Sequence, residues 1–314
     1  MANTLFCRAP MLKSLKNKPN TTLILLFTAF VTAKATERQV GCAWLKIPTG
    51  AREAAMAGTG TAAAFGPQAL VYNPAATARL APFSINASYT KWFLDTHHQS
   101  IFANRDLGIF QLGLGLSSFA YGRIEYREER PTEEPFGTFS PLDLTGYLNF
   151  ARTLGDIAEI GLSARYFYSK IINNQASALG ADAGFRLHPL PNLTVGLAVT
   201  DFGKTLYYYY EPFWLPTRAR VGLSWNLPIG ATRLTLTSDA SYFFYNRNFR
   251  ASAGTELTVN EILFLRAGCD PLNPGNRFSF GTGIRHRLFR LDYAWSPLGF
   301  NLGSAHRLSL SFGY

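Results

Sequence analysis

Apolar and polar residues alternate along most of the chain after residue 83. In "IGLSARYFYS", residues 160–169, the residues at even positions, such as Leu162, are mainly apolar, and the odd positions include Ser163 and Arg165. "RLTLTSDASY" and "LTVGLAV" repeat this period of two. Runs of about ten residues with an apolar face and a polar or small-residue face predict membrane-spanning β-strands.

The pattern predicts an all-β protein with about fourteen such strands, the even number that a bacterial barrel requires. The predicted spans are 83–93, 98–105, 109–120, 143–154, 157–170, 178–188, 192–202, 217–227, 232–243, 249–259, 262–269, 277–286, 288–296 and 306–314.

The connections between these segments alternate in length. Those after the even-numbered segments are tight: "RDLG", "GD", "LPLPN", "PIGAT", "NE" and "HR". Those after the odd-numbered segments are mostly longer, with "YGRIEYREERPTEEPFGTFSPL" and "DFGKTLYYYYEPFWLP" as the extremes. Short turns at one end and longer loops at the other are typical of outer-membrane barrels. We therefore predict a transmembrane antiparallel β-barrel over residues 83–314.

The C-terminal segment "HRLSLSFGY" alternates apolar residues and ends on an aromatic residue, Tyr314. It resembles the signal that the bacterial barrel-assembly machinery reads. We therefore expect that machinery and outer-membrane lipid as partners of the chain.

Composition agrees with a membrane location. The chain is 47% hydrophobic, 14% aromatic and 16% charged, against about 25% charged residues in soluble domains. No stretch after residue 35 offers the roughly 18 apolar residues of a spanning helix, so a closed barrel is the remaining way to span a membrane. The net charge of +10 comes mostly from arginines at strand positions. In an exported protein we do not take it as a sign of nucleic-acid binding.

The N-terminus predicts export. From Met11, lysines precede an apolar core at 23–31, and "AKA" ends at Ala35. This order is that of a secretory signal peptide. We expect residues 1–35 to be the signal peptide, cleaved after Ala35, with Met1 or Met11 as the start, and the bacterial outer membrane as the destination. Cys42 and Cys269 remain in the mature chain and can pair but need not.

The stretch "GTGTAAAFG", from Gly58, contains the spacing G-x-G-x-x-A of dinucleotide-binding folds. That fingerprint also needs a strand before it, a helix after it and an acidic residue about twenty positions later. The stretch follows "GAREAAMA", and no acidic residue occurs from Phe65 through Asn86. We therefore expect no nucleotide and no other cofactor. Small residues let a chain pass close to a barrel wall, so we predict that residues 36–82 form a plug inside the barrel.

Many ionisable residues fall at inward positions of the predicted strands. Because a charge facing lipid costs about 2–4 kcal/mol at the bilayer midplane, we expect these residues to line the lumen. One interpretation is a salt-bridged lumen that holds a plug, and the other is a basic passage for anions that would show anion-selective conductance. The residues are Arg165, Arg186, Arg218, Arg220, Arg233, Arg250, Arg266, Arg285, Arg290, Arg307, Glu159, Asp182, Asp239, Glu256 and Asp292.

One loop is unusually aromatic. It is either part of the aromatic girdle at the membrane interface or an exposed surface for a partner or an apolar ligand. Its aromatic residues are Tyr207, Tyr208, Tyr209, Tyr210, Phe213 and Trp214.

Catalysis has little support in the sequence. The only adjacent histidines, His97 and His98, lie near Asp95, and no other histidine has metal-ligand spacing to a carboxylate. No G-x-S-x-G motif occurs. We expect neither an enzyme nor a metal site.

Residues 44–80, "WLKIPTGAREAAMAGTGTAAAFGPQALVYNPAATARL", resemble the N-terminal segment of the PorV/PorQ family of FadL-like outer-membrane barrels. The matching positions are 45–47, 50–52 and 73–75 together with Met56, and the expected plug motif comprises Gly50, Ala51, Arg52, Met56, Gly58, Gly60, Asn73, Pro74 and Ala75. The chain departs from the family in lacking acidic residues before "NPA" and in reading "NPAAT" for "NPAGL".

The resemblance implies a fourteen-strand barrel with a luminal N-terminal segment. It implies a role in type IX-like protein secretion or surface delivery, with secretion components or secreted cargo as partners. The alternatives are a FadL-like transporter of hydrophobic small molecules and a structural barrel without transport. Deleting 44–80 is expected to leave an assembled, heat-modifiable barrel with larger conductance.

Overall fold

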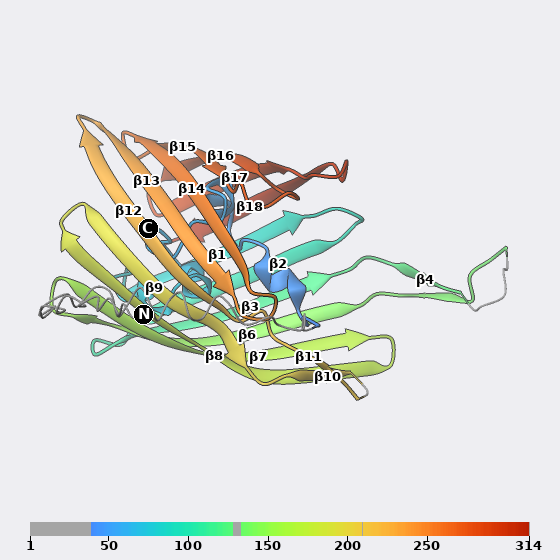
Figure 1. The fold of residues 1–314 in the computed structure, drawn as a ribbon. Helices are drawn as coiled ribbons and strands as arrows, with labels where there is room; N and C mark the ends of the chain where they lie inside the picture. Colours follow the sequence, from blue (N-terminus) through green and yellow to red (C-terminus); the bar gives the residue numbers. More distant parts are fainter. Residues whose placement is uncertain (1–38, 128–132, 209, 314) are drawn as a thin grey trace, which may run out of the picture. The chain divides into compact units, whose positions relative to one another are not determined.

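A computed structural model describes residues 39–127, 133–208 and 210–313 of the chain. The predicted signal peptide lies outside these residues. The described residues form one closed antiparallel barrel of fourteen strands, preceded by a mostly irregular N-terminal segment (Figure 1). The predicted fold class is confirmed. None of the described helices has the length and apolar content needed to cross a membrane.

The barrel strands follow the chain order, and the ring closes where the first strand pairs with the last. They are β1 (Phe83–Lys91), β2 (His97–Asp106), β3 (Gln111–Ala120), β6 (Leu142–Leu154), β7 (Ala158–Ile171), β8 (Asn174–Leu190), β9 (Leu193–Gly203), β12 (Arg218–Ile229), β13 (Thr232–Phe243), β14 (Asn248–Val259), β15 (Leu263–Cys269), β16 (Phe278–His286), β17 (Phe289–Pro297) and β18 (Ser304–Phe312).

Two of the longer loops contain hairpins that the alternation did not predict. The loop between β3 and β6 holds β4 (Ile124–Tyr126) paired with β5 (Gly137–Phe139), and this hairpin projects from the barrel (Figure 1). The loop between β9 and β12 holds β10 (Leu206–Tyr208) paired with β11 (Glu211–Phe213). Below, the end of the barrel with these loops is called the loop end, and the opposite end is called the turn end.

One predicted loop is absent. We expected residues 171–177 to connect two strands, but β7 and β8 continue to a tight turn at 172–173. Ile172 adopts a left-handed conformation there, with φ 53°. With 14 and 17 residues, these two strands exceed the roughly 9–11 residues that a membrane needs.

The alternation in the sequence corresponds to the two faces of the wall. In β7, Leu162 and Tyr166 are exposed, whereas Ser163, Arg165 and Phe167 are buried. Apolar side chains therefore face outward, as the contact with lipid requires. The inward side is mainly polar and also holds buried aromatic residues such as Phe167. The buried residues of the protein lie mainly inside the barrel.

The N-terminal segment contains four short helices. They are η1 (Ala43–Lys46), α2 (Ala51–Ala55), η2 (Pro67–Val71) and η3 (Pro74–Thr77). Proline sits in the first turn of η2 and η3, where a missing backbone N–H costs least. None of these helices is long enough to be stable alone, so their conformation depends on packing against the barrel wall.

Candidate functional site

The N-terminal segment runs through the lumen from the loop end to the turn end. At the loop end, Gly41 N donates to the carbonyl of Trp214 at 2.9 Å, and Trp214 N donates to the carbonyl of Gln39 at 2.8 Å. At the turn end, Asn104 Nδ2 donates to the carbonyl of Ala81 at 3.1 Å. Between these points α2 packs against β15–β18, and η3 packs against β6, β7 and β8.

The G-x-G-x-x-A stretch does surround an anion, but the anion belongs to the protein. The backbone N–H groups of Gly60 and Thr61 both donate to Asp239 Oδ2 at 3.0 Å, and the Thr61 hydroxyl donates to the same oxygen at 2.7 Å. Arg220 Nη2 also contacts it at 2.8 Å. Asp239 comes from the wall strand β13. The glycine-rich stretch therefore fixes the segment to the wall.

Asn73 makes a second attachment. Its side-chain oxygen accepts from Ala75 N at 3.0 Å and so caps η3. Its amide nitrogen donates to the carbonyl of Thr61 at 2.8 Å and to those of Phe185 and Leu197 in the wall at 3.2 and 3.3 Å. Asn73 is fully buried, so every polar atom of the side chain needs such partners.

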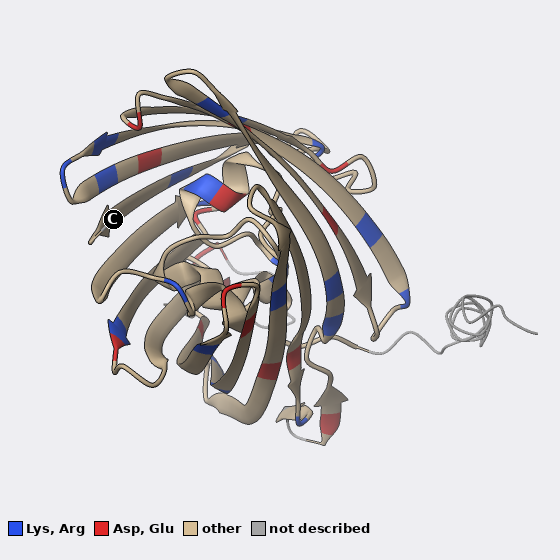
Figure 2. Ribbon diagram, turned by 90° about the vertical axis from the view of Figure 1, so that its left-hand side faces the viewer, with Lys and Arg blue, Asp and Glu red and all other residues tan. Residues whose placement is uncertain are grey.

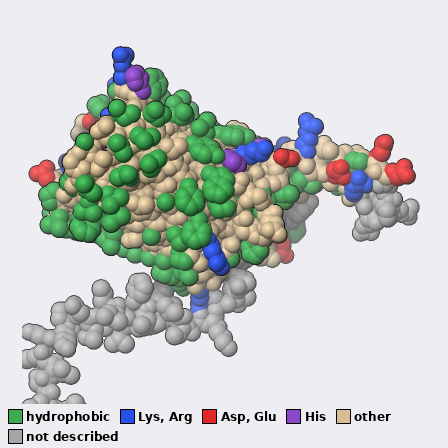
Figure 3. All heavy atoms as spheres, turned by 90° about the horizontal axis from the view of Figure 1, so that it is seen from above, with side chains coloured by type: hydrophobic (Ala, Val, Ile, Leu, Met, Phe, Trp, Pro, Cys, Tyr) green, Lys and Arg blue, Asp and Glu red, His purple; other side chains and the backbone are tan. Residues whose placement is uncertain are grey.

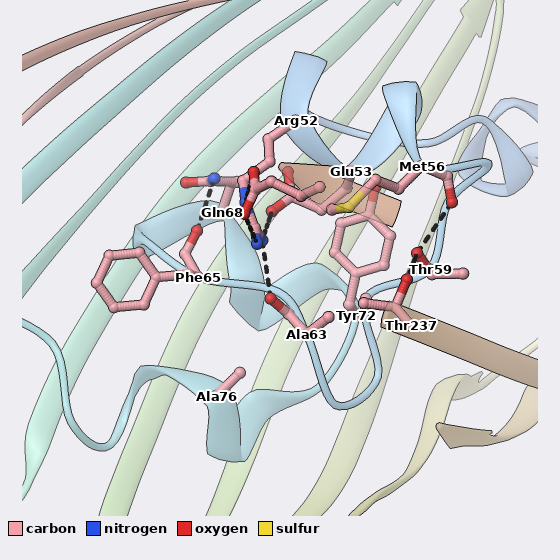
Figure 4. A network of polar contacts seen from close by, with 12 residues as sticks. Arg52, Glu53, Met56, Thr59, Ala63, Phe65, Gln68, Tyr72, Ala76 and Thr237 are labelled. Carbon is pink, nitrogen blue, oxygen red and sulfur yellow. Dashed lines mark hydrogen bonds and ion pairs between the residues drawn. The ribbon is translucent and has the colours of Figure 1, made fainter. Parts of the chain in front are cut away.

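Arg52 makes a third attachment through a bidentate ion pair. Its Nε and Nη2 donate to the two carboxylate oxygens of Glu256 at 3.0 and 2.8 Å. Its Nη1 donates to the carbonyl of Ala63 at 2.8 Å, so the same side chain closes the segment on itself (Figure 4). Ala51 N adds a bond of 2.8 Å to the Ser309 hydroxyl. The three attachments and the bond to Ser309 thus connect the segment to β8, β9, β13, β14 and β18.

Glycines in the wall make room for the segment. A Cβ placed at any of them would lie 2.0–2.8 Å from an atom of the segment, which is closer than real contacts allow. Each falls at an inward position of its strand, so an ordinary side chain would displace the segment. They are Gly161, Gly184, Gly196, Gly222, Gly254, Gly268 and Gly281. Sequence reasoning considered only the glycines of the segment itself; the recurring inward glycine of successive strands is the signal that could have revealed this fit.

The expected plug residues lie within this fit. Gly50 and Gly58 adopt positive φ of 83° and 76°, and a Cβ at Gly60 would overlap the ring of Tyr72. Met56 is fully buried against Gly254. Pro74 and Ala75 pack on Gly161 and Gly184. The motif residues are therefore brought together inside the barrel.

The predicted luminal charges are mostly buried and paired. Figure 2 shows acidic and basic positions on the strands around the inner segment. The pairs, with N···O distances where given, are Arg165 with Asp182, Arg220–Asp239 at 2.8 Å, Arg266–Glu256 at 2.5 Å, Arg266–Asp292 at 2.8 Å, Arg290–Asp292 at 2.9 Å and Arg186–Glu159 at 3.4 Å. This pairing agrees better with a salt-bridged lumen than with an open basic passage.

The remaining predicted charges differ in their surroundings. Arg233 and Arg285 are partly exposed at the turn end and pair with Glu261. Arg250 is half-buried, with Asp270 at 4.0 Å, and Arg218 lies 3.6 Å from Asp201. Arg307 has no carboxylate partner among the described residues; its guanidinium lies over the Trp92 ring at 5.0 Å.

One buried carboxylate was missed for a clear reason. Strict alternation places Asp201 of β9 on the outward face. A β-bulge between Ala181 and Ala183 shifts the pairing of β8 and β9, and Asp201, with φ 59°, turns inward and contacts Arg165 at 2.5 Å. Bulges re-aim side chains in this way, and no sequence signal other than the unusual outward acid marks this one.

A cavity of about 370 Å³ lies at the loop end, between the N-terminal segment and the loops. Its apolar lining includes Trp92, Phe93, Phe243, Phe300 and Leu302. Its charged lining includes the cations Lys46, Arg218, Arg220 and Arg250 and one carboxylate, that of Asp270. The volume falls within the range of small-molecule sites, about 300–1,000 Å³. The cavity can accept an apolar molecule with a polar or anionic group.

The aromatic loop lies beside this end of the segment. Tyr207 and Tyr210 are exposed, and Trp214 is 38% exposed. Phe213 packs on a buried apolar cluster that includes Leu206 and Leu215. Tyr208 belongs to β10, and Tyr209 lies outside the described residues. The hairpin therefore covers the segment while presenting some of its tyrosines outward.

The described histidine, cysteine and acidic side chains do not form a metal site. Among the described residues, no group of three or more histidine, cysteine, aspartate or glutamate side chains is placed to hold a metal ion. Cys42 and Cys269 are both free thiols. His97 and His98 point to opposite faces of the wall, because they are neighbours in β2.

Together these features define an outer-membrane-type barrel with a structured luminal segment and an amphipathic loop-end cavity. No family model matches the sequence, and no curated protein matches it. Solved structures do share the fold. The toluene transporter TodX of Pseudomonas putida is similar at a TM-score of 0.60 and 14% identity, over 88% of this chain and 98% of that one.

Two further structures extend the likeness. The monoaromatic hydrocarbon channel CymD has a TM-score of 0.60 at 10% identity, over 84% of this chain and 96% of that one. A Pseudomonas aeruginosa FadL homologue has a TM-score of 0.51 at 11% identity, over 88% and 100%. These likenesses show a shared barrel fold, in agreement with the fourteen-strand barrel that the N-terminal resemblance implies.

Proposed function

We propose that this protein is a non-enzymatic outer-membrane channel for hydrophobic small molecules, which enter from the cell surface through the loop-end cavity. The observation that carries the proposal is the cavity itself, where aromatic and aliphatic side chains face basic ones. Because outer-membrane barrels direct their longer loops outward, this cavity faces the surrounding medium.

The lining suggests the kind of molecule. Trp92, Phe93 and Phe300 supply apolar contact, and Lys46 and Arg250 are the least buried of the cations. Lys46 contacts only the Tyr245 hydroxyl, at 3.2 Å, among the hydrogen bonds of the described residues. An aromatic or aliphatic molecule with an anionic group would use both sets of side chains. A purely apolar molecule would use only the first.

The N-terminal segment is the proposed plug. It fills the lumen below the cavity, and its attachments at Asp239, Asn73 and Glu256 hold it across the path. A molecule that leaves the cavity must therefore pass beside the segment or displace it.

The secretion role implied by the N-terminal motif receives less support. TodX and CymD are described as a toluene transporter and a hydrocarbon channel, and both share the fold over most of their length. These likenesses favour small-molecule transport over type IX-like protein delivery. They also give no support to catalysis.

A pair of fluorescent probes tests the cavity. N-phenyl-1-naphthylamine and 1-anilinonaphthalene-8-sulfonate have the same aromatic body, and only the second is anionic. We expect the purified barrel to bind both and to bind the sulfonate more tightly. Lys46→Gln with Arg250→Gln should remove the preference for the sulfonate, whereas Lys170→Gln, an exposed change on β7, should not. Equal binding of the sulfonate by all variants would contradict the assignment.

A further inference from the structure

The outer face of the barrel carries a row of basic side chains at the loop end. Lys91 of β1 is paired in register with His97 of β2 on one side and with His306 of β18 on the other. All three lie on the outward face, in the same parity as Tyr89, Ile101 and Leu308. Cross-strand neighbours have Cβ atoms about 4.5–5.5 Å apart. The Cβ atoms of His97 and His306 are therefore about 10 Å apart, with Lys91 between them.

Tyrosines in the next row hold the two histidines. The Tyr89 hydroxyl is 2.7 Å from His97 Nδ1, and the Tyr293 hydroxyl is 2.7 Å from His306 Nδ1. The Ser304 hydroxyl lies 3.0 Å from the other ring nitrogen of His306, Nε2. The rings of Tyr89 and His97 are also stacked, with centroids 5.6 Å apart. These contacts reduce the side-chain freedom that would otherwise be lost when a ligand binds.

The described outward face of the strands around the row carries no acidic side chain. Among the described outward residues of β17, β18, β1, β2 and β3, none is aspartate or glutamate. The ion pairs among the described residues do not include Lys91. The connecting loops 92–96 and 298–303 contribute one carboxylate, that of Asp95. The surface at this point is therefore basic.

A depression of about 400 Å³ lies directly beneath the row on the same face. Its residues are the next two rows of the register. Ala87 lies between its cross-strand partners Ile101 and Leu310. Because its side chain is smaller than theirs, Ala87 forms the bottom of the depression. Leu116 and Leu308 complete the apolar rim. Figure 3 shows a face rich in hydrophobic side chains, with histidine beside lysine or arginine side chains at two places along it.

We propose that this row and the depression beneath it bind a phosphate-bearing lipid of the leaflet on the loop side. The phosphate would contact Lys91, His97 and His306, and one acyl chain would lie over Ala87. The site faces the bilayer and is separate from the luminal cavity, so it does not depend on the proposed transport function. A basic row at headgroup level with an acyl groove below it matches such a lipid in both charge and shape.

The test compares three ligands on the purified, detergent-solubilised full chain. They are phosphatidylglycerol, diacylglycerol with the same acyl chains, and free glycerol phosphate. We expect native mass spectrometry to show phosphatidylglycerol retained at least tenfold better than either of the others. Equal retention of diacylglycerol would overturn the role of the basic row, and equal retention of glycerol phosphate would overturn the role of the groove.

Variants locate the site. Replacing all three cations (Lys91→Gln, His97→Gln, His306→Gln) should weaken retention at least tenfold, since a cation near an anionic surface contributes roughly a fivefold gain. The matched control, His286→Gln with Arg287→Gln at the turn end, should leave it unchanged. Ala87→Phe should fill the groove and reduce retention, whereas Ala164→Phe on the outward face of β7 should not. Wild-type retention in both the triple variant and Ala87→Phe would refute the proposal.

Discussion

Asp239→Ala is the sharpest perturbation of the luminal segment. It removes the acceptor of three hydrogen bonds from Gly60 and Thr61, and it leaves the buried guanidinium of Arg220 without its ion pair. Hydrogen bonds to charged groups contribute about 1.5–3 kcal/mol each, and breaking a buried ion pair by removing one partner costs about 3–5 kcal/mol. Because water that enters the site restores part of this, we expect the segment to lose about 3 kcal/mol of attachment.

A loss of about 3 kcal/mol raises the population of the detached segment roughly 100-fold. Trypsin reports it, because the peptide bond after Arg52 is protected while that residue is buried against Glu256. Cleavage at this bond in the folded barrel should accelerate strongly in Asp239→Ala. Asp156→Ala, at an exposed turn, serves as the control.

Planar-bilayer recording gives the second measurement on the same variant. A detached segment opens the lumen, so Asp239→Ala should show brief conductance steps that the wild-type protein lacks. The barrel should remain heat-modifiable, since the wall hydrogen bonds are untouched. Unchanged cleavage together with an unchanged bilayer trace would refute the view that Asp239 holds the segment.

Four further predictions concern the fit of the segment to the wall, its deletion, its pH dependence and protein secretion. A Cβ at Gly196 would lie 2.2 Å from the carbonyl oxygen of Thr61, so Gly196→Val should lower the protection of the segment against trypsin while the barrel still assembles. The control is Gly146→Val, because a Cβ at Gly146 meets nothing within 4 Å. Equal protection in both variants would contradict the fit. Deleting 44–80 should leave a heat-modifiable barrel with larger conductance, and failure to assemble would show that the segment belongs to the folding core. Burial raises the pKa of Glu53 above its usual 4.5, so the attachment of the segment should weaken as the pH rises above that value. Glu53→Gln should remove this pH dependence when tryptic cleavage is measured across pH. The same pH profile in the variant and in the wild-type protein would contradict the prediction. Deletion of the gene should leave secretion of surface proteins unchanged, and a secretion defect would restore the type IX reading.

The strands could be predicted because a lipid-facing wall has a simple rule. Most outward side chains meet lipid and most inward ones meet a polar lumen, so residues such as Leu162 and Arg165 reveal their faces directly. The rule fails where pairing is irregular. Asp201 turns inward only because of a bulge between β8 and β9, and that bulge has no periodic signature.

The attachments of the segment could not be predicted from the sequence. The partners of Asp239 and of Asn73 lie far away along the chain, and only the closed barrel brings Thr61 to Asp239 and Asn73 to Leu197. The glycine stretch was expected to pass close to the wall, but the wall glycines opposite it, such as Gly196 and Gly222, were not recognised. Local rules describe each strand, whereas complementarity across the lumen depends on the whole ring.

Uptake of hydrophobic compounds by whole cells tests the proposed transport function. The protein would be expressed in a bacterium that lacks its own channels for hydrophobic compounds, and uptake of radiolabelled toluene and of a radiolabelled aromatic carboxylate would be measured. We expect faster uptake than in cells without the protein, with Lys46→Gln and Arg250→Gln slowing uptake of the carboxylate more than that of toluene. Uptake of both compounds at the rate of the empty cells, with the barrel present in the outer membrane, would contradict it.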